Sequence, residues 1–251
     1  MTIAENLNFK EKIVLVTGGA SGIGRAICQS FANQGATVVV LDMNLELAQE
    51  LTSTLENDAF ALQCDVTNNN SIDQAVSTVV QKYSKIDILV NSAGIALLNP
   101  AEVVGQAEWD KTLSVNLTGT FFMSQRVGKE MLKSGKGSII NLASQAASVA
   151  LTDHVAYCAS KFGVLGVTKV LASEWGGRGI TVNSVSPTVV LTELGKKAWA
   201  GAKGEALKSL IPTGRFAEPE EVASAVLFLA SEGARMINGA DLLIDGGYTI
   251  R

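Results

Sequence analysis

Short apolar segments alternate along the chain with longer segments in which apolar residues recur every three or four positions. The short segments are continuous aliphatic runs, which is typical of strands that are covered on both faces of a sheet. We expect seven strands, at 12–17, 36–42, 59–65, 86–93, 137–144, 180–186 and 242–245. The longer segments predict helices at 23–34, 44–57, 71–84, 107–134, 155–178 and 219–231.

This alternation predicts an α/β fold, a doubly wound Rossmann fold whose seven-stranded parallel sheet is flanked by helices on both faces. The chain has 251 residues and 47% hydrophobic content, which suits a single dinucleotide-binding and catalytic domain over 1–251. The exception to the alternation is 187–218, which contains Pro187, Pro212 and several glycines and has no predicted strand. We expect this segment to be a substrate loop within the domain.

The amino-acid composition limits which kinds of binding partner and which cellular compartment are expected. Charged residues make up 18% of the chain and the net charge is -4, so nucleic acid is not an expected partner. The three cysteines are widely spaced, which favours reduced thiols in a cytoplasmic protein. The N-terminus has no stretch of signal-peptide type, and runs such as 222–230 are far below the roughly 18 residues that span a membrane. No His/Cys/Asp/Glu cluster suggests a catalytic metal.

A glycine-rich segment, TGGASGIG (17–24), links the first predicted strand to the first helix. Glycines permit a tight turn, and the helix that follows offers free N–H groups to a pyrophosphate. Asp42 closes the second strand, 18 residues beyond Gly24, where a carboxylate can accept hydrogen bonds from ribose hydroxyls. Asp42 can also be read as a helix N-cap, and both readings can hold. Loop and acid together predict dinucleotide binding.

Asp42 also bears on which dinucleotide binds. The 2′-phosphate of NADP carries close to two negative charges, and a carboxylate at this position repels it. Met43, Asn44 and residues 21–23 offer no cation, and we expect Arg25 to be a surface helix residue. The sequence therefore predicts NAD.

YCASK (157–161) places a tyrosine and a lysine four residues apart, on one face of a predicted helix. The free pKa of tyrosine is about 10, so a base near neutral pH needs a downward shift worth roughly 3–4 kcal/mol. One positive charge about 4 Å away supplies about 4 kcal/mol at an effective dielectric constant of about 20. Lys161 alone is thus of the right order. The alternative is a buried tyrosine beside a lysine that extends to solvent.

Several separated motifs in this order make the chain similar to the short-chain dehydrogenase/reductase family over nearly its whole length. They are TGGASGIG (17–24), Asp65-Val66, NSAG (91–94), Asn116, Ser144, YCASK (157–161) and SPT (186–188). Two positions depart from the family pattern. Ser92 stands where the family usually has a second asparagine, and Thr188 stands where it often has glycine.

The resemblance implies a catalytic tetrad. Ser144 would hydrogen-bond the substrate oxygen, Tyr157 would take its proton, Lys161 would bind the nicotinamide ribose and polarise Tyr157, and Asn116 would hold a water that relays the proton. Ser144 can also be read as a turn residue, and Asn116 as a residue that faces solvent. The cofactor-binding residues implied by the resemblance are Gly18, Ser21, Gly22, Ile23, Gly24, Asp42, Asp65, Val66, Asn91, Ala93, Gly94, Tyr157, Lys161, Pro187, Val190 and Thr192.

A smaller set of residues resembles the branch of sugar-alcohol dehydrogenases and xylulose reductases, in which Pro187-Thr188 recurs. The set comprises Ser144-Gln145, His154, 187–195, Trp199 and 212–222. His154 is the only histidine and can be structural, but it precedes Tyr157 by one helical turn. We expect Ser144, Gln145, His154, Tyr157 and Trp199 to bind a small polyol or ketose. The activity expected is NAD-dependent oxidation of a polyol to a ketose or hydroxyketone.

Two other functions remain open. A 3-oxoacyl-(acyl-carrier-protein) reductase would favour NADP and a basic docking patch, part of which Arg126, Lys129, Lys133 and Lys169 could supply; Asp42 and the overall acidity weigh against it. A catalytically silent NAD-binding sensor would be supported by loss of Tyr157 or Lys161, and both are present.

The resemblance also implies a homotetramer. The helices at 107–134 and 155–178 would pair across a twofold axis, and the segment around 219–251 would form a second interface. The apolar residues that extend beyond one face of these helices include Phe121, Phe122, Val164, Val167 and Leu171.

Overall fold

The computed structural model describes residues 7–250; residues 1–6 and 251, the ends of the predicted domain, lie outside the described residues. Seven strands form one sheet in the order β3-β2-β1-β4-β5-β6-β7, and every neighbouring pair is parallel. The strands are β1 Ile13–Thr17, β2 Thr37–Asp42, β3 Phe60–Gln63, β4 Ile88–Asn91, β5 Gly137–Leu142, β6 Ile180–Pro187 and β7 Asp241–Ile244. The predicted doubly wound sheet is confirmed, and the strand order reverses between β1 and β4.

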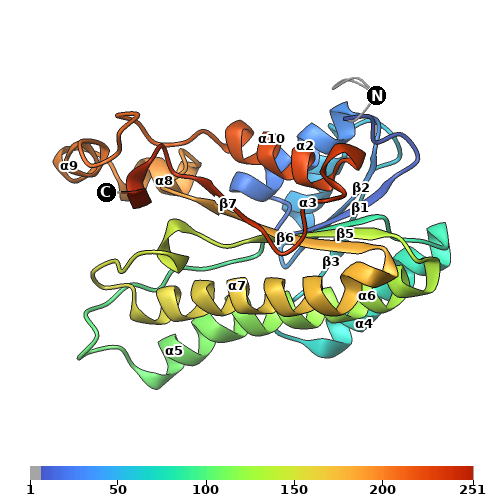
Figure 1. Ribbon diagram of the computed structural model, residues 1–251, viewed down its shortest axis with the longest axis horizontal. Coiled ribbons are helices and arrows are strands. Elements are labelled where there is room, and N and C mark those ends of the chain that lie inside the picture. The colour runs from blue at the N-terminus through green and yellow to red at the C-terminus, as the bar shows by residue number, and fades with distance from the viewer. Residues whose placement is uncertain (1–6, 251) are drawn as a thin grey trace.

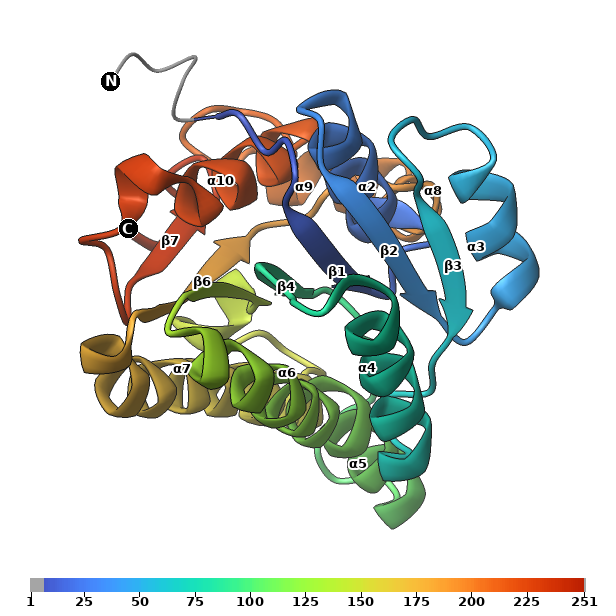
Figure 2. The ribbon, with the colours of Figure 1, turned by 90° about the vertical axis from the view of Figure 1, so that its right-hand side faces the viewer.

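Helices cover both faces of the sheet (Figure 1). One layer contains α2, α3 and α10, and the other contains α4, α6 and α7, as the view along the sheet shows (Figure 2). The helices are α2 Gly22–Asn33, α3 Leu45–Thr52, α4 Asn69–Tyr83, α5 Gln106–Leu113, α6 Thr120–Ser134, α7 Val155–Trp175, α8 Glu193–Ala198, α9 Ala202–Lys208 and α10 Pro219–Ala230. The short turns are η1 Ser114–Gly119, η2 Gln145–Ala147, η3 Gly176–Arg178, η4 Glu232–Ala234 and η5 Tyr248–Ile250.

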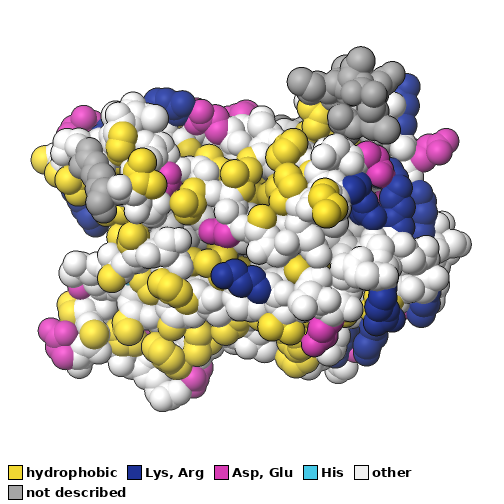
Figure 3. All heavy atoms as spheres, viewed as in Figure 1, with side chains coloured by type: hydrophobic (Ala, Val, Ile, Leu, Met, Phe, Trp, Pro, Cys, Tyr) yellow, Lys and Arg dark blue, Asp and Glu magenta, His cyan; other side chains and the backbone are white. Residues whose placement is uncertain are grey.

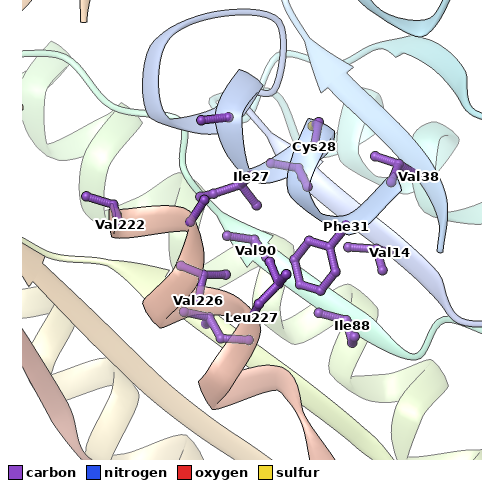
Figure 4. Close-up of a cluster of buried hydrophobic side chains, with 14 of the residues drawn as sticks. Val14, Ile27, Cys28, Phe31, Val38, Ile88, Val90, Val222, Val226 and Leu227 are labelled. Atoms are coloured by element: carbon purple, nitrogen blue, oxygen red, sulfur yellow. The ribbon is translucent and has the colours of Figure 1, made fainter. Parts of the chain in front are cut away.

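Side-chain alternation along the strands divides the core in two. Val14 and Val16 of β1 belong to the cluster under α2 and α10, whereas Leu15 belongs to the cluster under α4, α6 and α7. Figure 4 shows the first cluster, where Phe31 of α2 lies near Leu227 of α10. Phe31 is fully buried, and burial of such a side chain contributes about 1.5–3 kcal/mol relative to exposure. The two clusters hold the helices against both faces of the sheet, and the functional residues described below lie at the carboxyl ends of its strands.

The predicted strands at 86–93 and 137–144 are too long at their carboxyl ends. β4 ends at Asn91 and β5 ends at Leu142. Beyond β4, the N–H groups of Ser92 and Ala93 donate to Oγ1 of Thr17, at 3.1 and 3.2 Å, rather than to a neighbouring strand. The apolar pattern continues past the end of β4, but the backbone N–H groups there bind the Thr17 side chain and no longer form strand pairing.

The predicted helix at 107–134 is divided. α5 and α6 are separated by η1, a π-helical turn over Ser114–Gly119. Such turns insert an extra residue and often occur at functional sites. The segment 187–218 is less irregular than expected, because it contains α8 and α9; its one isolated bridge joins Val190 and Ala217.

The apolar helix Val155–Arg178 differs from the expectation that no segment is long enough to span a membrane. It has 24 residues and a mean hydropathy of 1.3, so by length and composition it could do so. Within the fold it packs on the sheet, with Val164 and Leu171 buried against the core. Core helices of soluble proteins pass the same test, so this helix is weak evidence for a membrane.

Candidate active site

The glycine loop between β1 and α2 requires its glycines. Gly18 and Gly22 have φ angles of 61° and 54°. A Cβ on Gly18 would lie 2.8 Å from Cα of Ala93, and a Cβ on Gly24 would lie 2.2 Å from the Gly18 carbonyl oxygen. The loop therefore lies directly against the NSAG segment, at the switch point between β1 and β4.

The N-terminus of α2 has free donors. Ser21, the N-cap, makes no side-chain capping bond. Within residues 7–250, the N–H groups of Gly22 and Ile23 form no hydrogen bond. Free N–H groups and the positive end of a helix dipole suit a pyrophosphate, so this loop fits a dinucleotide.

Asp42 is held against this loop at the end of β2. Its Oδ2 accepts from the N–H of Ala20 at 3.1 Å, and its Oδ1 accepts from the N–H of Asn44 at 3.0 Å. The N-cap of α3 is Asn44, which accepts from the N–H of Leu47. The alternative reading of Asp42 as the helix cap is therefore wrong. The acid is positioned by the glycine loop itself.

The neighbouring strands bring further predicted cofactor residues to the same edge of the sheet. Asp65 follows β3, and its Oδ1 accepts from the N–H and the hydroxyl of Thr67 at 2.9 and 2.7 Å. Val66 packs against η1, because a Cβ on Gly119 would lie 2.9 Å from the Val66 carbonyl oxygen. Both residues thus lie between β3 and the turn that carries Asn116.

Asn91 points away from the cleft. It is 3% exposed, and its side-chain amide donates to Ser124 at 2.9 Å and to Asn141 at 2.8 Å. Only the backbone of Asn91 is therefore available to a ligand. Thr17, which sequence reasoning missed, positions the NSAG backbone through the two N–H groups that its Oγ1 accepts. The residue alone carries no signal of this role, because the contact depends on the pairing of β1 with β4.

Ser144 and Tyr157 meet at the carboxyl edge of the sheet. The Ser144 hydroxyl lies close enough to Tyr157 to oppose a rise in the pKa of the tyrosine. Ser144 is also the N-cap of η2, and its Oγ accepts from the N–H of Ala146 at 3.2 Å. The turn reading and the functional reading of Ser144 are therefore compatible.

The pKa of Tyr157 differs from the sequence-based expectation. Burial raises this pKa above the usual value, and the nearby Ser144 hydroxyl opposes the change. The Lys161 ammonium lies 5.7 Å from the centre of the tyrosine ring. The comparison that found the charge of Lys161 to be of the right order left burial out, and burial is the largest influence on this pKa.

Lys161 is itself buried beside the end of β5. It is 5% exposed, and Nζ donates to the Leu142 carbonyl oxygen at 2.7 Å. Burial lowers the pKa of Lys161 to about 8. A Cβ on Gly94 would lie 3.7 Å from Nζ and 3.4 Å from Oδ1 of Asn116. Lysine, asparagine and the NSAG glycine therefore form one compact group.

Asn116 does not face solvent, so that alternative is wrong. The side chain is fully buried. Its Oδ1 accepts from the N–H of Ile95 at 2.8 Å. Its Nδ2 donates to the Ile95 carbonyl oxygen at 2.9 Å and to Oγ of Ser160 at 3.1 Å. The side chain is therefore fully engaged. Its backbone carbonyl oxygen accepts from the Thr120 hydroxyl at 2.8 Å. Because the side chain is engaged, the implied water would have to bind at this backbone carbonyl.

Two of the predicted substrate residues lie beside the tetrad. Gln145 follows Ser144 and is 4% exposed, and its buried Oε1 has no hydrogen-bond partner within residues 7–250. The His154 ring packs edge-on to the Tyr157 ring, with centroids 6.0 Å apart. Nδ1 of His154 contacts the Thr152 carbonyl, which can only accept. Nδ1 therefore carries the proton, and Nε2 is left as an acceptor.

The structure gives Trp199 no contact with the tetrad. The indole packs edge-on to Phe216, with centroids 6.2 Å apart, and the Lys203 ammonium lies 4.5 Å from it. The start of the same segment does reach the cofactor loop, because a Cβ on Gly22 would lie 3.3 Å from Cγ2 of Thr192. Pro187 and Val190 are buried at the end of β6 and just beyond it.

Comparisons with known proteins agree with this geometry. A family model described as enoyl-(acyl carrier protein) reductase matches residues 18–249. A D-threitol dehydrogenase of Mycolicibacterium smegmatis is 60% identical over 243 residues, which cover 96% of this chain and 94% of that protein. An NAD-dependent glycerol dehydrogenase of Listeria innocua is 50% identical over 247 residues, with 98% and 97% covered. A 3-oxoacyl-[acyl-carrier-protein] reductase of Thermotoga maritima is 40% identical over 249 residues, with 97% and 100% covered.

The chain therefore belongs to the short-chain dehydrogenase/reductase family. The comparisons confirm three predictions made from the sequence: the family, its polyol-dehydrogenase branch, and NAD as the cofactor. The more distant match to the carrier-protein reductase agrees with the ranking of the two activities made from Asp42.

Proposed function

We propose that this protein is an NAD-dependent dehydrogenase that oxidises one secondary alcohol of a small polyol to a ketone, giving a ketose or hydroxyketone. The observation that carries this proposal is the proximity of Ser144 to Tyr157, with Lys161 buried on the same helix and held by the Leu142 carbonyl oxygen at the end of β5. The hydroxyls of Ser144 and Tyr157 could thus both contact the same substrate oxygen. A silent sensor has no need of this arrangement.

The residues of the cleft fit NAD. The free N–H groups at the start of α2 would hold the pyrophosphate, and Asp42 would accept from the adenosine ribose. Lys161 would bind the nicotinamide ribose, near Gly94. When bound, NAD accepts the hydride from the carbinol carbon. The remaining chemistry is the removal of one proton.

Tyr157 takes that proton while Ser144 holds the substrate oxygen. The base must be a phenolate, and burial disfavours it. Positive charge is therefore required nearby, and Lys161 supplies part of it below its pKa of about 8. The rest has to come from the oxidised cofactor, so Tyr157 becomes a base only once the site is loaded. A water on the Asn116 carbonyl would then pass the proton outward.

Polyhydroxylated substrates suit the wall opposite this group. Nε2 of His154 can accept from one substrate hydroxyl, and Gln145 can pair with another. Trp199 would reach an apolar carbon only if the segment 187–218 closes over the cleft. The protein would act in the cytoplasm, where NAD and small polyols are available.

A substrate panel tests the proposal. With NAD, we expect D-threitol, glycerol, xylitol or galactitol to give NADH, followed by its absorbance, and monohydric alcohols to be poor substrates. A site built around hydroxyls leaves its own polar groups unpaired when they are absent. Rapid turnover of a 3-oxoacyl thioester with NADPH, with every polyol inert, would replace this proposal by the carrier-protein reductase.

The basic patch expected of a carrier-protein reductase is weaker in the structure than the sequence suggested. Arg126 pairs with Asp73 at 3.0 Å, and Lys133 pairs with Glu130 at 2.7 Å. Half of the four-residue basic patch is thus neutralised by acidic neighbours.

We further propose a homotetramer, with different contact residues from those expected. Val164 and Leu171 are buried in the monomer core and cannot form an interface. Val155, Phe162 and Val170 instead form an exposed stripe on α7, between 41% and 55% exposed. Figure 3 shows hydrophobic side chains gathered over this region. A second exposed group comprises Phe228, Leu242 and Leu243 of α10 and β7.

Light scattering tests this assembly. We expect four times the monomer mass for the wild type, and dimers for Phe162→Glu, because a charge on α7 disrupts one of the two axes. Leu47→Glu is a matched control that should stay tetrameric, because it places the same charge on an exposed apolar residue of α3, on the opposite face of the sheet from α7. A monomeric wild type at micromolar concentration would contradict the proposal.

A further inference from the structure

A second buried polar atom at the carboxyl edge of the sheet has no partner. Within residues 7–250, Oγ1 of Thr188 forms no hydrogen bond, like Oε1 of Gln145. The two residues are 7% and 4% exposed. Buried polar atoms are almost always paired, so an unpaired one often marks the position of a ligand or water. Oδ1 of Asn91, at the end of β4, is unpaired too, but that side chain is directed into the core toward Ser124 and Asn141. Thr188 and Gln145 lie beyond their strands, and these two call for a common explanation.

Gln145 and Thr188 lie just beyond the carboxyl ends of two adjacent strands, β5 and β6. Leu142 of β5 pairs with Val185 of β6. Gln145 follows Leu142 by three residues, and Thr188 follows Val185 by three residues. η2, which contains Gln145, packs against both β6 and α7. The two residues are thus carried by packed elements at the same end of the sheet.

Thr188 faces the helix that carries the tyrosine. Its N–H donates to the Ile244 carbonyl at 3.1 Å, so the strand conformation continues through Thr188. Along β6, Val182 packs into the core under α7, whereas Val185 packs into the core under α10. Side chains alternate, so the even-numbered residues of β6 face α7. Thr188 therefore points to the layer whose first turns hold Tyr157.

The chemistry of the pair matches a hydroxyl group. A threonine hydroxyl and a glutamine amide can each donate and accept, as an alcohol can. Neither is charged, which favours a neutral partner over a carboxylate or an ammonium group. Many members of the family carry glycine after the proline that ends this strand, and Thr188 adds a hydroxyl where they have none.

We propose that Thr188 and Gln145 form a subsite for a hydroxyl on the carbon next to the one that is oxidised. The inference rests on the proposed function, in which Ser144 and Tyr157 hold the reacting hydroxyl. It names Thr188 as a determinant of specificity for vicinal diols. A substrate without the second hydroxyl leaves both buried side chains unpaired and is discriminated against for that reason.

Butane-2,3-diol and butan-2-ol test the subsite, because they differ only by the neighbouring hydroxyl. With NAD, we expect the wild type to prefer the diol in kcat/KM by roughly 10- to 100-fold. Thr188→Val keeps the shape and removes the hydroxyl, and should lower kcat/KM for the diol about tenfold. The value for butan-2-ol should stay within about threefold, and Thr188→Ser should retain the preference for the diol.

Thr181→Val is the matched control. It makes the same change at the opposite end of the same strand, about 23 Å away along β6, and should leave both substrates unaffected. An equal loss for the diol and the mono-alcohol in Thr188→Val would overturn the subsite, as would a rise confined to the KM for NAD. If the wild type oxidises polyols without preferring the diol, only the subsite fails. If it oxidises no polyol, the proposed function fails and the subsite with it.

Discussion

Replacement of Tyr157 by phenylalanine is expected to lower kcat by about a thousandfold or more, because the variant has no group to take the substrate proton. The ring that packs against His154 is retained, so the shape of the site should be kept. NADH affinity, measured by fluorescence titration, should be nearly unchanged. Lys161→Ala should lose both turnover and NADH affinity, because Lys161 is assigned a cofactor contact as well.

Tyr83→Phe is the control for this experiment. Its hydroxyl is also buried and has no hydrogen-bond partner within residues 7–250, but it lies at the end of α4, near the start of β3. This variant should keep wild-type activity. Substantial turnover by Tyr157→Phe would show that another group removes the proton.

Substitution of Asp42 should give the second large effect, on the choice between NAD and NADP. The wild type should strongly prefer NAD, because the carboxylate at the end of β2 repels a 2′-phosphate. Removal of the charge in Asp42→Ala should change the ratio of kcat/KM values for NAD and NADP by roughly 10- to 100-fold in favour of NADP. Initial rates with each cofactor measure this ratio directly.

The structure adds a complication to that experiment and a means of resolving it. Asp42 accepts from the N–H groups of Ala20 and Asn44, so alanine leaves both donors unpaired and loosens the glycine loop. Asp42→Asn removes the charge and keeps an acceptor oxygen. If charge governs the preference, Asp42→Asn should shift it almost as far as Asp42→Ala, with a smaller rise in the KM for NAD. A wild type that is faster with NADP at equal concentration would refute the argument.

Local patterns in the sequence were sufficient for much of this site. The spacing of Tyr157 and Lys161 follows from helix geometry alone, and the glycine loop from its position between a strand and a helix. The structure brings Ser144 and His154 to Tyr157, as expected.

Features that depend on tertiary contacts could not be predicted. Thr17 has no local signal, because its role requires β1 and β4 to be neighbours. α7 is apolar on nearly every side, so its periodicity could not separate the buried Val164 from the exposed Phe162. The pKa of Tyr157 was misjudged because burial is a property of the fold, whereas the charge of Lys161 can be read from the sequence.

The most direct test of the central claim follows the hydride itself. The polyol that is most active in the panel is prepared with deuterium on its carbinol carbons and incubated with the wild-type protein and NAD, and the NADH formed is analysed by mass spectrometry. Transfer from carbon to the cofactor predicts NADH that carries one deuterium, and no NADH from the Tyr157→Phe variant. Unlabelled NADH, or a polyol consumed without NADH, would contradict an NAD-dependent polyol dehydrogenase.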